Sequence, residues 1–154
     1  MVKKTANEKL NDSRDMPKIA ILEDPKAIGR YGGNRLLIAP PLDYDELMKQ
    51  VPQGLLTTSD RIRDHLARRY KADATCPLTA GIFINIVAQA SFERDGLVTP
   101  YWRTLKKDGE INEKFPGGLE EQRLQLEGEG HRIVKKGSRY FVADYQNHLF
   151  DFKD

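Results

Sequence analysis

The chain has 154 residues, of which 25 are lysine or arginine and 23 are aspartate or glutamate, so its formal net charge is only +2. This length suits one domain with short extensions, and the near-neutral charge means that any nucleic-acid-binding surface must be local. Mean hydropathy is −0.62, and no apolar run reaches the roughly 18 residues that a membrane helix needs. The single cysteine, Cys76, excludes an internal disulfide and a cysteine-built zinc site.

The N-terminal part of the chain predicts an arm followed by a strand-rich extension. Residues 1–16 are polar and without periodicity, so we expect a flexible arm that is ordered only where Leu10 can dock. They also lack the apolar stretch of a signal peptide, which predicts a cytoplasmic protein. Residues 17–42 hold two short apolar runs, Lys18–Leu22 and Arg35–Ala39, each ended by turn residues. We expect two strands here, and their spacing does not decide whether they pair.

The next part of the chain predicts two helices. Asp43–Gln50 carries an apolar stripe and forms the first. The second begins at Thr58 or Ser59, because a hydroxyl side chain can cap the first turn of a helix. Its apolar residues recur every four positions, as expected for a helix with one buried face, at Ile62, Leu66 and Tyr70.

Two further helices follow. Pro77 opens the first, since proline is favoured at the start of a helix. The residues behind it, Leu78–Ser91, are apolar nearly all round, which is typical of a buried helix. Gly117-Gly118 introduces the other helix, which we expect to end near Gly128.

The C-terminal part predicts a β-hairpin. His131–Lys136 and Arg139–Val142 are two strand-like runs, separated by Gly137-Ser138, the length of a tight hairpin turn. A short last helix is expected over Ala143–Phe150. The helices, short strands and basic hairpin together predict an α+β, mostly helical, winged helix-turn-helix-like domain over residues 43–154.

Four blocks between Val51 and Gly130 occur in the order found in one family of DNA-repair proteins. They are Val51-Pro52-Gln53-Gly54-Leu55-Leu56-Thr57-Thr58, then Thr79-Ala80-Gly81, then Pro100-Tyr101-Trp102-Arg103, and last the segment from Lys107-Asp108-Gly109 through Phe115-Pro116-Gly117-Gly118 to Leu126-Glu127-Gly128-Glu129-Gly130. Any one block is a weak signal, whereas four in order are specific. Over about half of its length, the chain resembles the DNA-binding domain of alkylguanine-DNA alkyltransferases.

This resemblance implies that alkyl-transfer chemistry is lost. In the family, a cysteine thiolate attacks the alkyl group of a flipped guanine, after a histidine held by a glutamate has removed the thiol proton. Here Tyr101 stands at the cysteine position and Trp102 at the histidine position, and only Glu129 remains. A phenol has a pKa near 10, and tryptophan cannot accept a proton. The chain is therefore similar to the noncatalytic alkyltransferase-like proteins, which bind alkylated DNA and flag it for repair.

The resemblance also assigns contacts with double-stranded DNA that contains an alkylated guanine. Leu78 occupies the position of an arginine that replaces the flipped base in the stack, and an apolar wedge can also part bases. Arg103 matches an arginine that holds the active-site loop. The expected DNA-binding residues are Thr57, Thr58, Ser59, Leu78, Thr79, Gly81, Asn85 and Arg103, and the expected base pocket is formed by Tyr101, Trp102, Phe115 and Glu129. No cofactor or metal is expected, and a DNA-repair protein is the expected further partner.

Other interpretations stay open at this stage. The apolar helix after Pro77 and the three aromatic side chains can simply be core. The near-neutral charge and the leucine at position 78 favour a winged-helix protein-interaction module that has lost DNA binding. An enzyme with new chemistry is a third alternative, in which Glu129 would act as a base beside the aromatic pocket.

Overall fold

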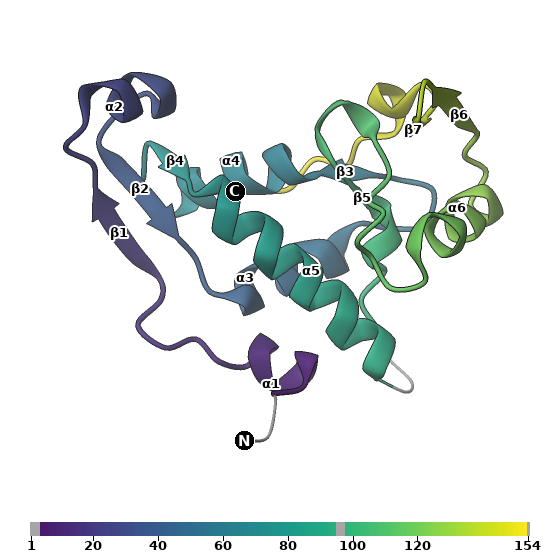
Figure 1. Ribbon diagram of the computed structural model, residues 1–154, viewed down its shortest axis with the longest axis horizontal. Coiled ribbons are helices and arrows are strands. Elements are labelled where there is room, and N and C mark those ends of the chain that lie inside the picture. Colours follow the sequence, from purple (N-terminus) through teal and green to yellow (C-terminus); the bar gives the residue numbers. More distant parts are fainter. Residues whose placement is uncertain (1–3, 95–97, 154) are drawn as a thin grey trace.

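The structure, a computed structural model, describes residues 4–94 and 98–153. Helices α3, α4 and α5 lie between two groups of short strands (Figure 1). The α+β class expected from the sequence is confirmed. Within the described ranges, no helix has both the length and the apolar character needed to cross a bilayer.

The first group of strands is a three-stranded sheet. β1 (Lys18–Ile21) pairs antiparallel with β2 (Arg35–Ile38), so the two strands expected in the extension are confirmed and do pair. β2 also pairs in parallel with β4 (Ala74–Thr75), a strand that the sequence did not predict. Because β2 lies in the middle of the sheet, Leu37 is fully buried. Helix α2 (Pro25–Tyr31), which connects β1 with β2, was also not predicted.

The N-terminal segment contains a helix where the sequence predicted a flexible arm. This helix, α1 (Ala6–Leu10), is capped by reciprocal hydrogen bonds between the backbone and the side chains of Thr5 and Glu8. Leu10 is buried in the main core, as expected if it docks. Residues 1–3 of the predicted arm lie outside the described residues.

The main core is formed by the three central helices. They are α3 (Pro41–Gln50), α4 (Ser59–Arg69) and α5 (Pro77–Glu93), close to the ranges that the sequence predicted. The apolar face expected on α4 is buried at Ile62 and Leu66. Fully buried side chains at the helix contacts are Tyr44, Leu47, Met48, Ile62, Leu66 and Val87.

The second group of strands begins with a short parallel pair. β3 (Thr57–Thr58) precedes α4 directly and pairs with β5 (Thr104–Leu105), which follows the 3-10 helix η1 (Tyr101–Arg103). A second 3-10 helix, η2 (Lys107–Gly109), and then α6 (Gly118–Gly128) complete this part. A smaller core lies beneath these elements and consists of Leu56, Leu105, Ile111, Leu126 and Val142.

The predicted C-terminal hairpin is confirmed. β6 (Ile133–Lys136) and β7 (Arg139–Val142) pair antiparallel, with Lys136 opposite Arg139. Gly137 adopts a φ of 64°, the left-handed conformation that tight hairpin turns require. A 3-10 helix, η3 (Tyr145–His148), stands where a short last helix was expected.

Two leucines of α6 provide a matched test of this packing. Leu126 is 0% exposed in the smaller core, whereas Leu124 is 64% exposed. Leu126→Ala is expected to lower the free energy of unfolding by about 2–5 kcal/mol, because it removes buried methyl groups and leaves a cavity. Leu124→Ala removes the same atoms from the surface and should change that free energy by less than about 0.5 kcal/mol. Urea denaturation measures both values, and equal losses would contradict the packing of α6.

Candidate nucleic-acid interface

Helix α5 is buried on one side only. Ala80, Ile84 and Val87 are buried against the other helices, whereas Leu78 is 72% and Ile82 is 48% exposed. The expectation, from its apolar composition, that this helix is buried was therefore wrong for this face. Apolar composition cannot show which side of a helix lacks a neighbour. We call the exposed residues Leu78, Gly81 and Ile82 the α5 ridge.

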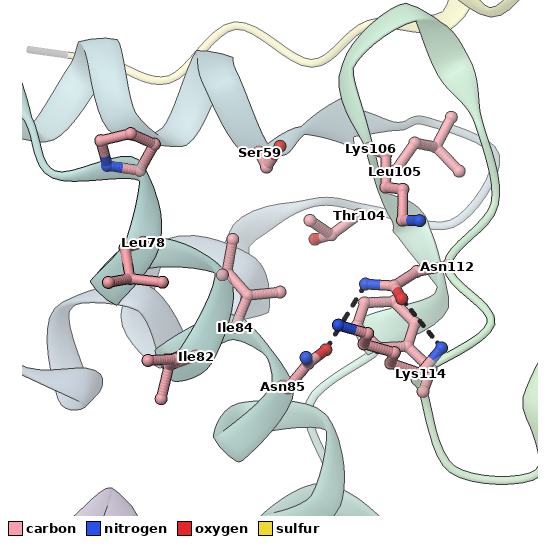
Figure 2. A pocket seen from close by; sticks show the side chains of 13 residues that line it. Ser59, Leu78, Ile82, Ile84, Asn85, Thr104, Leu105, Lys106, Asn112 and Lys114 are labelled. Atoms are coloured by element: carbon pink, nitrogen blue, oxygen red, sulfur yellow. Dashed lines mark hydrogen bonds between the residues drawn. The ribbon is translucent and has the colours of Figure 1, made fainter.

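A groove with a volume of about 320 Å³ lies beside this ridge (Figure 2). One wall is the N-terminal half of α5, including the α5 ridge and Asn85. The other wall comes from β5 and the loop after it, and includes Thr104, Lys106, Asn112 and Lys114. Ser59, the first residue of α4, also lines this hollow, which we call the α5 groove. Concave sites with an apolar lining and a few polar groups are typical of ligand-binding pockets.

The wall opposite α5 carries positive charge and amide groups. Lys114 is exposed, and the ammonium of Lys106 lies 3.3 Å from a carboxylate oxygen of Glu113. Asn112 donates a hydrogen bond from Nδ2 to Oδ1 of Asn85 at 3.4 Å, which joins the two walls (Figure 2). Its Oδ1 accepts a hydrogen bond from the backbone N–H of Lys114 at 2.9 Å. This wall therefore offers donors to an electron-rich ligand.

Thr104 also lines the α5 groove, and its hydroxyl is buried. Thr104 is 1% exposed, and its Oγ1 has no hydrogen-bond partner among the described residues. Thr57, which lies opposite Thr104 in the parallel pair, has a hydroxyl in the same condition. A buried polar group without a partner costs free energy, so these two hydroxyls lower the stability of the parallel pair.

The three aromatic residues expected to form the base pocket pack together. The ring centroid of Tyr101 lies 5.4 Å from that of Trp102 and 5.4 Å from that of Phe115, both in edge-to-face geometry. Tyr101 is 4% and Phe115 is 3% exposed, and only Phe115 lines the α5 groove. Burial raises the pKa of Tyr101, and the nearby charge of Glu121 raises it further. The phenol therefore stays neutral inside the core.

Glu129 is held by two side chains from η1. Arg103 donates from Nε and Nη2 to the two carboxylate oxygens of Glu129, at 2.7–3.1 Å, and the indole N–H of Trp102 donates to Oε2 at 2.9 Å. Arg103 also donates to the carbonyl of Val51 at 2.8 Å, and the backbone N–H of Gly54 lies 3.4 Å from Oε1 of Glu129. We call this arrangement the Glu129 clamp. It joins η1, the end of α6 and the turn before β3.

The charge of Glu129 is stabilised by these bonds. Burial raises its pKa, but the hydrogen bonds from Arg103 and Trp102, together with the charge of Arg103, outweigh that effect and lower the pKa below its ordinary value. The carboxylate is therefore ionised at neutral pH and occupied by its neighbours.

The structure brings some of the sequence-predicted residues together and separates others. Ser59, Leu78, Gly81, Asn85 and Phe115 all line the α5 groove. The other predicted residues lie elsewhere. Thr57 and Thr58 are buried, and the hydroxyl of Thr79 donates to the carbonyl of Cys76. Arg103 and Trp102 belong to the Glu129 clamp, and Tyr101 lies in the core.

Sequence reasoning did not assign eight of the groove residues to the site: Pro77, Ile82, Ile84, Thr104, Leu105, Lys106, Asn112 and Lys114. A local signal existed for two of them. An asparagine bonds readily to the backbone N–H two residues later, so Asn112 predicts a turn that orders Lys114. Thr104 gave no such signal, because its position depends on pairing with Thr57 across a long sequence separation.

Comparisons with known proteins show the fold. No protein-family model matches the chain, and no curated protein matches it. S. pombe Atl1, solved in complex with damaged DNA containing O6-carboxymethylguanine, is 18% identical over 72% of this chain and 94% of that chain, with a TM-score of 0.51. S. pombe ATL in complex with DNA is 16% identical over 84% and 99%, with a TM-score of 0.48. The likeness to Atl1 confirms the fold that the sequence motifs implied.

Removing the charge of Glu129 tests the clamp. Glu129→Gln leaves the guanidinium of Arg103 without its counter-charge, so we expect the free energy of unfolding to fall by about 1.5–3 kcal/mol at neutral pH. Because the folded-state pKa of Glu129 is lowered, its contribution is present above the ordinary value of 4.5 and is lost as the pH falls through the folded-state pKa. The difference between the two proteins should therefore shrink in acid, as measured by urea denaturation from pH 7 to about pH 3.

The control for this experiment is Glu127→Gln. Glu127 is exposed and pairs with Arg123 on the surface of α6, so its substitution should cost less than about 1 kcal/mol. A loss for Glu129→Gln no larger than this, or one that does not depend on pH, would show that the clamp contributes little to stability.

Proposed function

We propose that this protein is a noncatalytic, alkyltransferase-like DNA-binding protein. The α5 ridge enters the minor groove of duplex DNA, and the α5 groove receives an extruded base such as an alkylated guanine. One observation carries the proposal: a concave site with a cationic wall opens directly beside exposed apolar residues of a helix. The fold, shared with a protein solved on DNA containing O6-carboxymethylguanine, supports it.

The chemistry of the α5 ridge suits base extrusion. Apolar side chains inserted between bases unstack them, and Leu78 and Ile82 are large, apolar and exposed. Gly81 between them has no side chain, so the helix backbone can approach DNA closely. The extruded base would then meet the amides of Asn85 and Asn112, which can read its edge.

The surrounding elements fit a winged helix-turn-helix arrangement. In this interpretation, α4 and α5 are the paired helices and the β6–β7 hairpin is the wing. Ser59 at the start of α4 offers its hydroxyl and the free N–H groups of the first turn to a phosphate. Thr57 and Thr58 are buried beneath it, so they position Ser59 and do not touch the phosphate.

The side chains around the groove support binding without alkyl transfer. Among the described residues that line the α5 groove, none is a cysteine or a histidine. Tyr101 is buried with a raised pKa, and Trp102 donates its only polar hydrogen to Glu129. Cys76 lies outside the groove lining. A protein that holds a damaged base but cannot repair it needs a DNA-repair protein as a further partner.

A second function is favoured by the same exposed apolar residues. Leu78 and Ile82 would also suit a protein-interaction module, because exposed apolar side chains are common at protein contacts. The two functions differ in their response to DNA and salt.

DNA binding is tested by fluorescence anisotropy with a duplex that contains O6-carboxymethylguanine and with the unmodified duplex. We expect binding at low salt, tighter for the modified duplex, with an affinity that falls steeply as salt rises because phosphate contacts release counterions. Absence of binding to either duplex at low salt would contradict the proposal and favour the interaction module.

A matched pair of glycine variants locates the contact. Gly81 and Gly29 both lie within helices, and a Cβ at either position meets no atom within 4 Å. Leucine is a better helix former than glycine, so Gly81→Leu and Gly29→Leu should both fold at least as stably as the parent. Only Gly81→Leu should weaken DNA binding, because the added side chain keeps α5 away from the minor groove. Equal affinities for the two variants would place the DNA elsewhere.

Alkyl transfer is tested by the intact mass of the protein after incubation with the alkylated duplex. We expect no change in mass, because no described side chain in the α5 groove provides a thiolate. A gain of one alkyl group would overturn the noncatalytic interpretation, and peptide mapping would then identify Cys76 or Tyr101 as the acceptor.

A further inference from the structure

A second hollow follows the opposite side of the α5 ridge. It has a volume of about 260 Å³ and shares Ile82 with the α5 groove. On a helix with roughly 100° between residues, Phe83 and Ile86 lie on one side of Ile82, and Leu78 and Asn85 lie on the other. Phe83 and Ile86 line the second hollow, whereas Leu78 and Asn85 line the first. The α5 ridge therefore separates two hollows.

The outer wall of the second hollow is basic and comes from the N-terminal segment. It includes Lys4, Lys9 and Arg14, together with the single carboxylate of Asp12. Lys4 and Arg14 both pair with Asp12, at 2.7 and 3.3 Å. The charged residues that line this hollow are three cations and one anion, so the lining has a net positive charge, and Lys9 lies near Glu93 and not against Asp12.

The N-terminal segment is fixed to α5. The carboxylate of Glu93, in the last turn of α5, accepts hydrogen bonds from the backbone N–H groups of Ala6 and Asn7, at 3.1 Å each. The side-chain amide of Asn7 donates to the same carboxylate at 3.0 Å and to the carbonyl of Ala90 at 3.2 Å. Leu10 is buried in the main core beside them. The N-terminal segment is therefore held at a set position along α5, and α1 lies beside α5 (Figure 1).

The α5 ridge thus has cations on both sides. Lys106 and Lys114 stand across the α5 groove, and the N-terminal cations stand across the second hollow. A helix that enters the minor groove of DNA has one sugar-phosphate strand on each side. Cations on both sides of the α5 ridge therefore match the phosphates of both DNA strands better than those of one strand.

We infer that the N-terminal segment is a second phosphate-binding wall, which contacts the strand opposite to the one contacted by Lys106 and Lys114. The inference rests on the proposed function and extends it, since it assigns Lys4, Lys9 and Arg14 to the DNA backbone. Phosphate contacts carry no base information. This wall therefore adds affinity and salt dependence without changing the preference for an alkylated base.

The test compares two double variants with equal changes in charge. Lys9→Gln with Arg14→Gln removes two cations from the N-terminal wall, and Lys26→Gln with Arg30→Gln removes two exposed cations from α2, which lies outside the proposed DNA-binding surface. Fluorescence anisotropy with the alkylated and unmodified duplexes, at several salt concentrations, measures affinity and its salt slope. We expect the N-terminal variant to bind both duplexes roughly tenfold more weakly at 0.1 M salt, with a slope smaller by about 1 to 2, and the α2 variant to keep most of the affinity and slope of the parent.

An N-terminal variant that binds DNA as tightly as the parent would overturn the inference. Equal losses of affinity in the two variants would also overturn it, because the total charge of the protein would then explain both. A loss confined to the alkylated duplex would also overturn it. If the parent protein itself does not bind DNA at low salt, the proposed function fails together with the inference, so the two failures are distinguishable. If both variants unfold at the same midpoint temperature as the parent protein, the fold is kept.

Discussion

The bonds that Glu129 makes with Arg103 and Trp102 fix the architecture around the α5 groove. A carboxylate that is mostly buried is stable only if its oxygens are hydrogen-bonded, and here both are. The partners come from η1 and from the turn before β3, so one side chain joins segments far apart in sequence. Thr104 follows η1 directly and Lys106 comes two residues later, so the clamp holds the start of the segment that forms this groove wall. Gln122 supports the same wall, because its buried amide donates to the carbonyl of Trp102 and accepts from the backbone N–H of Asn112.

The residues that the sequence resemblance aligned with the alkyl-transfer machinery have structural contacts in the folded protein. Tyr101 fills the core between Trp102 and Phe115, and Trp102 reaches back to Glu129. Glu129 neutralises Arg103 and accepts the indole N–H of Trp102. The proposed function assigns recognition, not bond making, to the α5 groove, and these contacts fit that proposal.

The distribution of charge explains how a chain with a net charge of +2 can offer a surface to an anion. Many cations are neutralised locally, as in the pairs of Arg61 with Asp151 and Arg139 with Glu110. Lys114 is exposed beside one hollow and Lys9 beside the other. Position relative to α5, and not the total charge, decides which cations an approaching duplex would meet.

The sequence by itself determined the elements whose pattern is local. The four-residue spacing of Ile62 and Leu66 identified α4, Pro77 marked the start of α5, and Gly137 marked the hairpin turn. The tertiary structure alone decided which faces are covered. The sequence of an apolar helix is the same whether or not a neighbour covers it, so composition could not show that one face of α5 is exposed. For the same reason, the sequence left open whether Tyr101 lies in the core or in a pocket. Helix α1 and strand β4 depend on partners distant in the chain, Glu93 and β2, whose contacts exist only after folding.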